Sequence, residues 1–221
     1  MELFDYIYNN DIISITNYNN NINFENLENM TPLFIAIELN NLEVVKLLIK
    51  KNANVNYVNK QGIFAIILAI YNNNFLIIRE LLKADANINR IENSKYIPLL
   101  CAIKYNDYET IKYLILFGSN INYECSKTGD TPLKYAIRLN KLDIVKLLII
   151  NKAEINALCS NKVSPLHIAC YYNFNDIAQY LIDNGANPYL ETKYGWTATK
   201  YATKNNNSNL LNILIRNHID I

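Results

Sequence analysis

Residues 31–40 read TPLFIAIELN, and variants of this stretch return along the chain at a nearly fixed interval. The Thr31 hydroxyl can cap the first N–H groups of a helix, and Pro32 fits the first helical position. The apolar run then meets Asn40, a residue type that tolerates the left-handed backbone needed where a helix stops and reverses. The stretch therefore predicts a short apolar helix followed by a tight turn.

Two independent series of residues show that the chain is built from repeats. An Asn-apolar-Asn signature recurs every 33 residues, then once one residue late, and once more in altered form; its markers are Asn23, Asn56, Asn89, Asn122, Asn156 and Tyr189. A second series has spacings of 33, 33, 34, 33 and 33 residues: Ala36, Ala69, Ala102, Ala136, Ala169 and Ala202. In both series one interval is longer by a single residue, and the longer interval lies in the same repeat. A shared period of this length indicates a repeat architecture.

Each repeat has the same internal order. A second helix, residues 42–49 in the first repeat, shows apolar positions at helical spacing, and we expect residues such as Leu47, Leu76 and Leu147 to be core. An Asn stands four residues after every marker Ala: Asn40, Asn73, Asn106, Asn140, Asn173 and Asn206. The second helices are expected to stop, with a positive φ, at Asn52, Asp85, Gly118, Lys152 and Gly185.

The helix–turn–helix of 33 residues with a T-P-L-H-x-A signature resembles the ankyrin repeat. The signature stands at residues 31–36, 97–102, 131–136 and 164–169, and 184–188 resemble the turn of that family. Thr-Pro is replaced at 64–65, Pro is lost at 198, and only His167 keeps the signature histidine. The resemblance covers about residues 24–221.

The resemblance implies an all-α fold, an ankyrin-repeat solenoid of stacked helix–turn–helix units with short hairpin-like loops. We expect a single domain over 1–221. It would comprise an N-terminal cap (1–23), five repeats (24–56, 57–89, 90–122, 123–156 and 157–189) and a C-terminal capping repeat (190–221).

Composition narrows the function classes. The chain has 221 residues, is 51% hydrophobic and carries a formal net charge of +1, which argues against a nucleic-acid binder or a polybasic membrane anchor. No apolar run is long enough for a membrane span, and the N-terminus has no signal-peptide pattern. Four cysteines and two histidines lack the short spacings of a metal site. We therefore expect the protein to bind no metal and no cofactor and to be a monomer. Its thiols should be buried or half-buried, and the protein should be cytoplasmic.

By resemblance, ankyrin arrays bind another protein on their concave face, with the inner ends of the first helices and the loop tips. Transferred to this chain, the partner-binding candidates are Tyr71, Tyr96, Lys104, Tyr105, Arg138, Tyr171, Tyr172, Tyr194 and Trp196. Tyr, Trp and Arg dominate interface hot spots. The only Trp, at an expected loop tip, is the strongest candidate. The competing interpretation is that the 17 tyrosines reflect A/T-rich codons.

Two other functions were weighed against a protein-binding scaffold or adaptor. An enzyme is disfavoured because no Gly-rich phosphate loop or hydrolase motif is present; His167 and Cys170, three residues apart on one expected helix, are the only Cys–His pair considered. The Asn/Ile/Tyr/Lys-rich style is similar to ankyrin proteins of viruses and A/T-rich intracellular microbes. That similarity implies an effector in the host cytoplasm that sequesters a host factor or recruits it to a ubiquitin ligase. Because the sequence stops at Ile221, we expect such a member to act by binding alone.

Overall fold

The computed structural model describes residues 2–89, 96–105, 107–125, 129–159 and 161–216. These residues form fourteen α-helices and one isolated antiparallel bridge, between Val58 and Phe64. The all-α expectation is confirmed. The helices are α1 (Glu2–Tyr8), α2 (Ile12–Asn17), α3 (Pro32–Glu38), α4 (Leu42–Lys50), α5 (Ala65–Tyr71), α6 (Phe75–Lys83), α7 (Pro98–Tyr105), α8 (Tyr108–Leu116), α9 (Pro132–Arg138), α10 (Leu142–Ile150), α11 (Pro165–Tyr171), α12 (Asn175–Asp183), α13 (Ala198–Lys204) and α14 (Ser208–Arg216).

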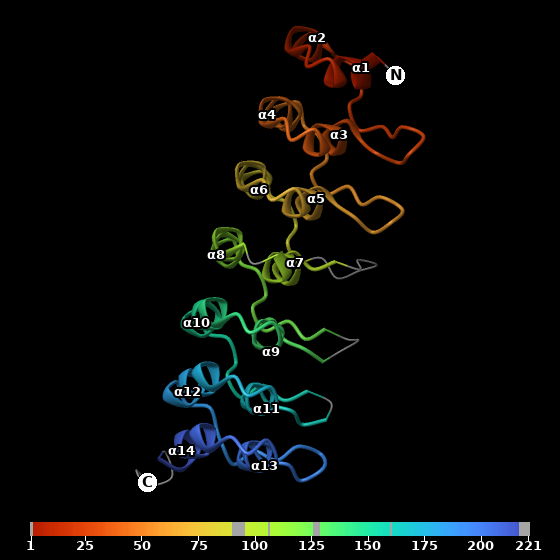
Figure 1. The fold of residues 1–221 in the computed structure, drawn as a ribbon. Helices are drawn as coiled ribbons and strands as arrows, with labels where there is room; N and C mark the ends of the chain where they lie inside the picture. The colour runs from red at the N-terminus through yellow and green to blue at the C-terminus, as the bar shows by residue number, and fades with distance from the viewer. Residues whose placement is uncertain (1, 90–95, 106, 126–128, 160, 217–221) are drawn as a thin grey trace. The chain divides into compact units, whose positions relative to one another are not determined.

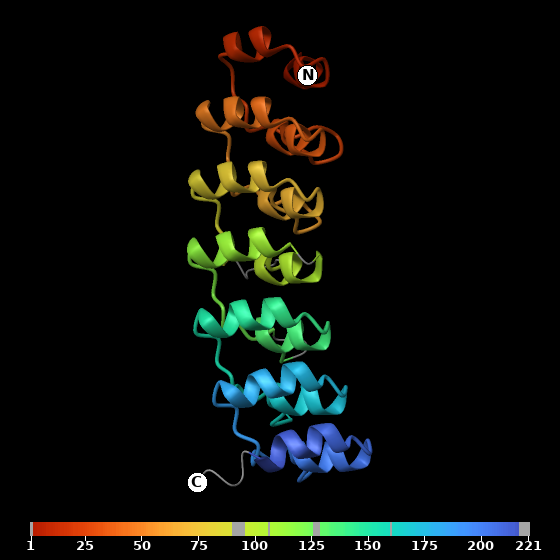
Figure 2. The same ribbon diagram turned by 60° about the vertical axis from the view of Figure 1, so that its left-hand side comes forward.

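The chain divides into two compact parts, an N-terminal unit (Met1–Ser119) and a C-terminal unit (Asn120–Ile221). Within each unit the odd-numbered helices pack in one row and the even-numbered helices in a second row (Figures 1 and 2). The loops that precede α3, α5 and α13 project beside the first row of their unit (Figure 1). Each helix pair therefore packs against its neighbours in the same unit, as stacked helix–turn–helix repeats do. The single domain with the repeat boundaries given above stays a prediction.

The first helix of a repeat begins as its sequence predicts. The hydroxyl of Thr31 accepts a hydrogen bond from the Phe34 N–H at 3.3 Å, and Pro32 occupies the first turn. Thr131, Ser164 and Thr197 cap their helices in the same way. Phe64, which stands in place of Thr, makes no side-chain cap. The Thr-Pro signature is thus a set of helix starts rather than a binding motif.

The turns adopt the left-handed backbone expected of them. The inter-helix asparagines have φ between 52° and 61° at Asn40, Asn73, Asn140, Asn173 and Asn206, whereas Asn106 lies outside the described residues. The second helices end on positive φ at Asn52, Asp85, Gly118, Lys152 and Gly185. Lys152, at φ 72°, is the one residue of these five that is not Gly, Asn or Asp, the types that tolerate this backbone best.

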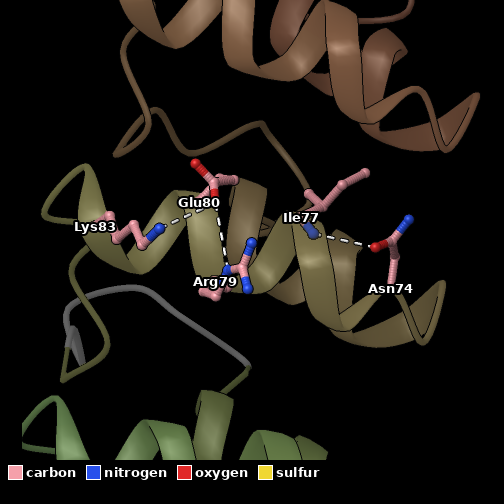
Figure 3. A network of polar contacts seen from close by, with 5 residues as sticks. All are labelled: Asn74, Ile77, Arg79, Glu80 and Lys83. Atoms are coloured by element: carbon pink, nitrogen blue, oxygen red, sulfur yellow. Dashed lines mark hydrogen bonds and ion pairs between the residues drawn. The ribbon is translucent and has the colours of Figure 1, made fainter.

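Most second helices are capped by short polar side chains, whereas α10 and α12 have no side-chain cap. Asn41, Asn74 and Asp107 each accept a hydrogen bond from a backbone N–H three residues later. Figure 3 shows Asn74 bonded to the Ile77 N–H at the start of α6 and Glu80 joined to both Arg79 and Lys83 further along. The caps define where each helix starts, and two of them also reach the preceding repeat: Asn41 Nδ2 donates to Asn10 Oδ1 at 2.6 Å and Asn74 Nδ2 to Asn40 Oδ1 at 2.7 Å.

The marker asparagines connect one repeat to the next. Asn56 donates from Nδ2 to the Asp85 carbonyl at 3.2 Å, and its Oδ1 accepts from the Asn87 N–H at 2.7 Å. Asn23, Asn122 and Asn156 form the same two-bond clamp on the following repeat, and Asn89 donates to the Gly118 carbonyl. The 33-residue Asn series therefore has a physical cause, because each member joins the loop of its own repeat to the helix end of the next.

Burial corrects part of the expected core. Leu48 and Leu148 are fully buried and Leu147 is buried, but Leu47 is only half-buried and Leu76 is 44% exposed. On a helix of nine residues, only the positions that face both the partner helix and the adjacent repeats are enclosed. Leu76, in the first turn of α6, falls outside that stripe, so its prediction as core was wrong.

We predict that Leu48→Ala lowers the free energy of unfolding by about 2–5 kcal/mol, because it removes a fully buried side chain and leaves a cavity. Leu76→Ala, at an exposed position of the same type of helix, is the matched control and should change stability far less. Urea denaturation followed by circular dichroism measures both. Equal losses for the two variants would contradict the assignment of the core.

We predict that Asn56→Ala lowers the free energy of unfolding by roughly 1–2 kcal/mol, since it removes two hydrogen bonds between consecutive repeats. Asn56→Asp keeps an acceptor for the Asn87 N–H but loses the donor to Asp85, so its loss should be intermediate. An Asn56→Ala protein as stable as the unmodified chain would show that the clamp carries no stability.

Candidate functional site

A cluster of three tyrosines lies in the N-terminal unit. Tyr71, at the end of α5, packs edge-to-face against Tyr96 at 5.9 Å and against Tyr105, at the end of α7, at 5.4 Å between ring centroids. Lys104 places its ammonium 5.7 Å from the ring centroid of Tyr105. The structure therefore brings together all four candidates of this unit, which we call the N-unit tyrosine cluster.

Tyr71 contacts both other tyrosines of this cluster. Burial, followed by the neighbouring Cys101, Tyr96 and Tyr105, raises the pKa of Tyr71 well above its ordinary value. Its ring is 36% exposed, compared with 46% for Tyr105. Tyr71 is therefore a neutral, partly buried support, and Tyr105 offers more of its surface to a partner.

A larger group of aromatic rings lies in the C-terminal unit. Tyr201, on α13, is its centre: its ring contacts Trp196 at 4.8 Å, Tyr171 at 5.9 Å and His167 at 5.9 Å. Tyr172 packs edge-to-face on Tyr171 at 4.8 Å. Tyr171 and Tyr172, at the end of α11, are 56% and 44% exposed. We call Tyr171, Tyr172, Trp196 and Tyr201 the C-unit aromatic cluster.

Two ammonium groups stand over the indole of this cluster. Lys200 Nζ lies 4.9 Å and Lys204 Nζ 5.1 Å from the ring centroid of Trp196. Both lysines are exposed and belong to α13. Neither forms an ion pair with another residue that the structure describes. Cation–π attraction thus holds two positive charges next to an aromatic surface without neutralising them.

Sequence reasoning missed Tyr201, the residue that connects the others. Tyr201 stands three residues after Ala198 and one before the marker Ala202, on the side of α13 that faces α11. The signal was present, because the same step before a marker Ala gives Tyr135 in an earlier repeat. The candidate positions were the inner ends of the first helices and the loop tips, and Tyr201 lies one turn before the helix end.

Several other candidates lie differently from the expectation. Arg138 is paired with Asp130 through Nε, at 3.0 and 3.2 Å, so its charge is already engaged. Tyr194, 72% exposed, lies in the loop tip. The Trp196 carbonyl accepts from the Thr192 N–H at 2.9 Å, so Trp196 closes the base of this loop rather than standing at its tip.

Asn72 and Asn205 occupy positions expected to face a partner, but they bond to the preceding repeat instead. Asn72 Nδ2 donates to the Ile37 carbonyl at 2.9 Å, and Asn205 Nδ2 donates to the Cys170 carbonyl at 3.2 Å. The short amide side chain of Asn at this position can bond the end of the neighbouring helix. A tyrosine at the same position in another repeat is longer and extends past that helix end. The two helix ends that carry Asn are therefore structural.

His167 ties a helix start to the next loop. Its Nδ1 accepts from the Ser164 N–H at 3.1 Å, and its Nε2 lies 2.9 Å from the Leu190 carbonyl. A carbonyl can only accept, so Nε2 carries the proton and Nδ1 is the acceptor. Burial lowers the pKa of His167 below its ordinary value of 6.5, while hydrogen bonds to the backbone at Leu190 and Trp196 oppose the shift. In the preceding repeat Lys134 holds this position and donates to the Gly129 carbonyl of its own loop at 3.5 Å.

The Cys–His pair considered from the sequence has no nucleophilic geometry. Both ring nitrogens of His167 are engaged as described, and burial raises the pKa of the Cys170 thiol to about 12. A thiol with so high a pKa carries almost no thiolate at neutral pH. Among the described residues no group of three or more His, Cys, Asp or Glu side chains could hold a metal ion.

Family comparison agrees with these contacts. The profile of ankyrin repeats in three copies matches residues 3–92, 89–159 and 140–221. The chain belongs to the ankyrin-repeat family. The stacked helix–turn–helix units are the repeats of that family, which is generally one of binding scaffolds rather than of catalytic domains.

Solved structures with the same fold include other ankyrin-repeat domains. The ankyrin-repeat domain of Bcl-3, a member of the IkappaB family, is 22% identical with a TM-score of 0.86, over 97% of this chain and 98% of that one. The domain of human ASB11 is 21% identical with a TM-score of 0.75, over 98% and 97%. A chain from the complex of the Bdellovibrio bacteriovorus predatory endopeptidase Bd0816 with immunity protein Bd3460 is 25% identical with a TM-score of 0.70, over 83% and 96%. No curated protein matches.

No described helix of this ankyrin-repeat chain combines the length and apolar character needed to cross a membrane.

We predict that the ankyrin-repeat protein loses stability on acidification through His167. Because its folded-state pKa lies below its unfolded value, the unfolded chain binds the proton first, so the free energy of unfolding falls as pH drops through about 6.5. His167→Gln keeps a side chain that can bond the Ser164 N–H but does not titrate. Urea unfolding between about pH 7.5 and pH 5 should show a smaller slope in this variant. Identical slopes would contradict the buried, neutral histidine.

Proposed function

We propose that this ankyrin-repeat chain binds a partner protein through the C-unit aromatic cluster, with the N-unit tyrosine cluster as a further contact region. Both clusters lie on the first helices and the loops before them, the region that ankyrin arrays present to partners on their concave face. The coarser conclusion, that the chain is a protein–protein interaction module, follows from its family. The identity of the surface is the proposal.

One observation carries it. Exposed Tyr171 and Tyr172 are connected through Tyr201 to a half-buried Trp196 whose ring is flanked by two ammonium groups. Aromatic side chains that are packed on one side and open on the other lose little conformational freedom on binding, and they bury much area. The lysines add long-range attraction for a partner with negative charge near its contact residues.

The alternative that tyrosine abundance alone explains the clusters is addressed by the contacts. Tyrosines also occur in the even-numbered row, at Tyr108 and Tyr113 of α8 and Tyr180 of α12. What distinguishes the clusters is that Tyr71 packs on Tyr105 and Tyr171 on Tyr201 across consecutive repeats, an arrangement that abundance alone does not require. The effector function and a role with ubiquitin ligases stay predictions. Cys101 and Cys170 are buried thiols, which supports a reducing compartment such as the cytoplasm.

The test uses the whole protein as bait in an extract of the cells that express it. We expect the Tyr171→Ala/Tyr172→Ala variant to recover at least about tenfold less of the specific partner than the unmodified protein, as for hot-spot residues. The control variant Tyr108→Ala/Tyr189→Ala removes two tyrosines of similar exposure outside the cluster and should recover as much as the unmodified protein. Mass spectrometry measures the recovery, and thermal melts establish that both variants fold.

A second readout applies once a partner is purified. Trp196 is the only tryptophan, so its fluorescence reports directly on the C-unit aromatic cluster. Saturable change in emission on adding a tryptophan-free fragment of the partner supports the proposal. Undiminished recovery with the tyrosine variant, or unchanged emission at saturation, contradicts it.

A further inference from the structure

A hollow of about 460 Å³ lies in the N-terminal unit, between α1 and the loop that precedes α3. Its apolar lining comes from Phe4 and Tyr8 of α1 and from Phe24 and Leu27 of the loop. Its volume falls within the range of protein pockets that accept small ligands or anchoring side chains. It contains no residue of the N-unit tyrosine cluster or of the C-unit aromatic cluster.

The walls of the hollow differ in how firmly they are held. Phe4 is buried and packs edge-to-face on Phe24, with ring centroids 5.1 Å apart. Tyr8 is 56% exposed, and Leu27 at the loop tip is 103% exposed, so it makes no contribution to the core. The packed Phe4 and Phe24 form the floor of the hollow, and Leu27 stands exposed at its rim. Leu27 gains apolar contacts only when another apolar group occupies the hollow.

The rim of the hollow is negatively charged. Asp5, Glu25 and Glu28 line it, and all three are exposed. None of them forms an ion pair with another described residue. Glu28 also lies near Glu38, at the end of α3: burial and then the charge of Glu28 raise the pKa of Glu38. The rim therefore carries negative charge that no ion pair among the described residues neutralises, although Glu25 also bonds the side chain of Tyr57.

We propose that this hollow is a second docking site, which accepts an apolar side chain of a partner protein flanked by Lys or Arg. The apolar walls provide the burial and the acidic rim selects the sign of the neighbouring charges, because like-charged segments are repelled. The site is independent of the proposed function, since it shares no residue with the N-unit tyrosine cluster or with the C-unit aromatic cluster. That cluster carries lysines, so the two surfaces suit partner segments of opposite charge.

The test uses the full chain and two labelled peptides, one of alternating leucine and arginine and one of alternating leucine and glutamate. Fluorescence anisotropy should show saturable binding of the arginine peptide and much weaker binding of the glutamate peptide to this site. Leu27→Ser removes the exposed apolar contact, and Glu28→Lys reverses one rim charge. Each substitution should weaken the binding of the arginine peptide by about fivefold or more. Both positions are exposed, so neither variant is expected to disturb folding.

Matched controls separate the site from general attraction. Leu116→Ser replaces another highly exposed leucine, and Glu43→Lys reverses an exposed acidic charge outside the hollow. Both should bind the arginine peptide as the unmodified chain does. Equal effects of control and site variants overturn the proposal, as does the absence of arginine-peptide binding. A dimer in sedimentation that Leu27→Ser dissociates also overturns it, because the occupant would then be a second copy. The Tyr171→Ala/Tyr172→Ala protein should bind the arginine peptide normally, whatever the outcome at the other surface.

Discussion

The helices of this protein are too short to exist without their neighbours, and every other feature depends on that constraint. They have six to nine residues, below the length at which an isolated helix is stable in water. Burial between adjacent helix pairs supplies the missing stability, and marker asparagines such as Asn56 align one pair with the next by bonding both a carbonyl and an N–H. Packing is non-directional, whereas these bonds fix the offset between repeats. Together they explain why both residue series keep the same period.

The same constraint decides which side chains remain for binding. Within each unit, the sides of the helices that face adjacent repeats are consumed by the core, so what is left lies at the helix ends and on the loops. At α5 and α11 these ends carry Tyr71 and Tyr171, and the next repeat supplies a further tyrosine, Tyr105 or Tyr201, to pack on them. The aromatic surface is thus a consequence of stacking, since each ring is supported by a ring one repeat away.

Much of this architecture could be predicted from the sequence, because the strongest signals are local. A cap at Thr31, a left-handed turn at Asn40 and a helix end at Asp85 depend on a few adjacent residues, and all are confirmed. The predictions that failed involve contacts between repeats. Leu76 is apolar at helical spacing yet exposed, because the edge of a short helix is outside the packed stripe.

The candidate site was predictable in part for the same reason. Residue type and repeat position were enough to bring Tyr71, Tyr96 and Tyr105 together. They did not identify Tyr201, whose importance comes from Trp196 folding onto it, nor did they show that Asn205 reaches across to the preceding helix. Side-chain reach between repeats is a three-dimensional property that a linear period does not encode.

Circular dichroism of an isolated peptide spanning residues 31–51, which contains α3 and α4, tests the central claim most directly. If stacking on neighbours supplies the stability, this helix pair should be largely unfolded in water at every temperature, although both helices are present in the intact chain. A peptide that is strongly helical and melts cooperatively by itself would contradict the account.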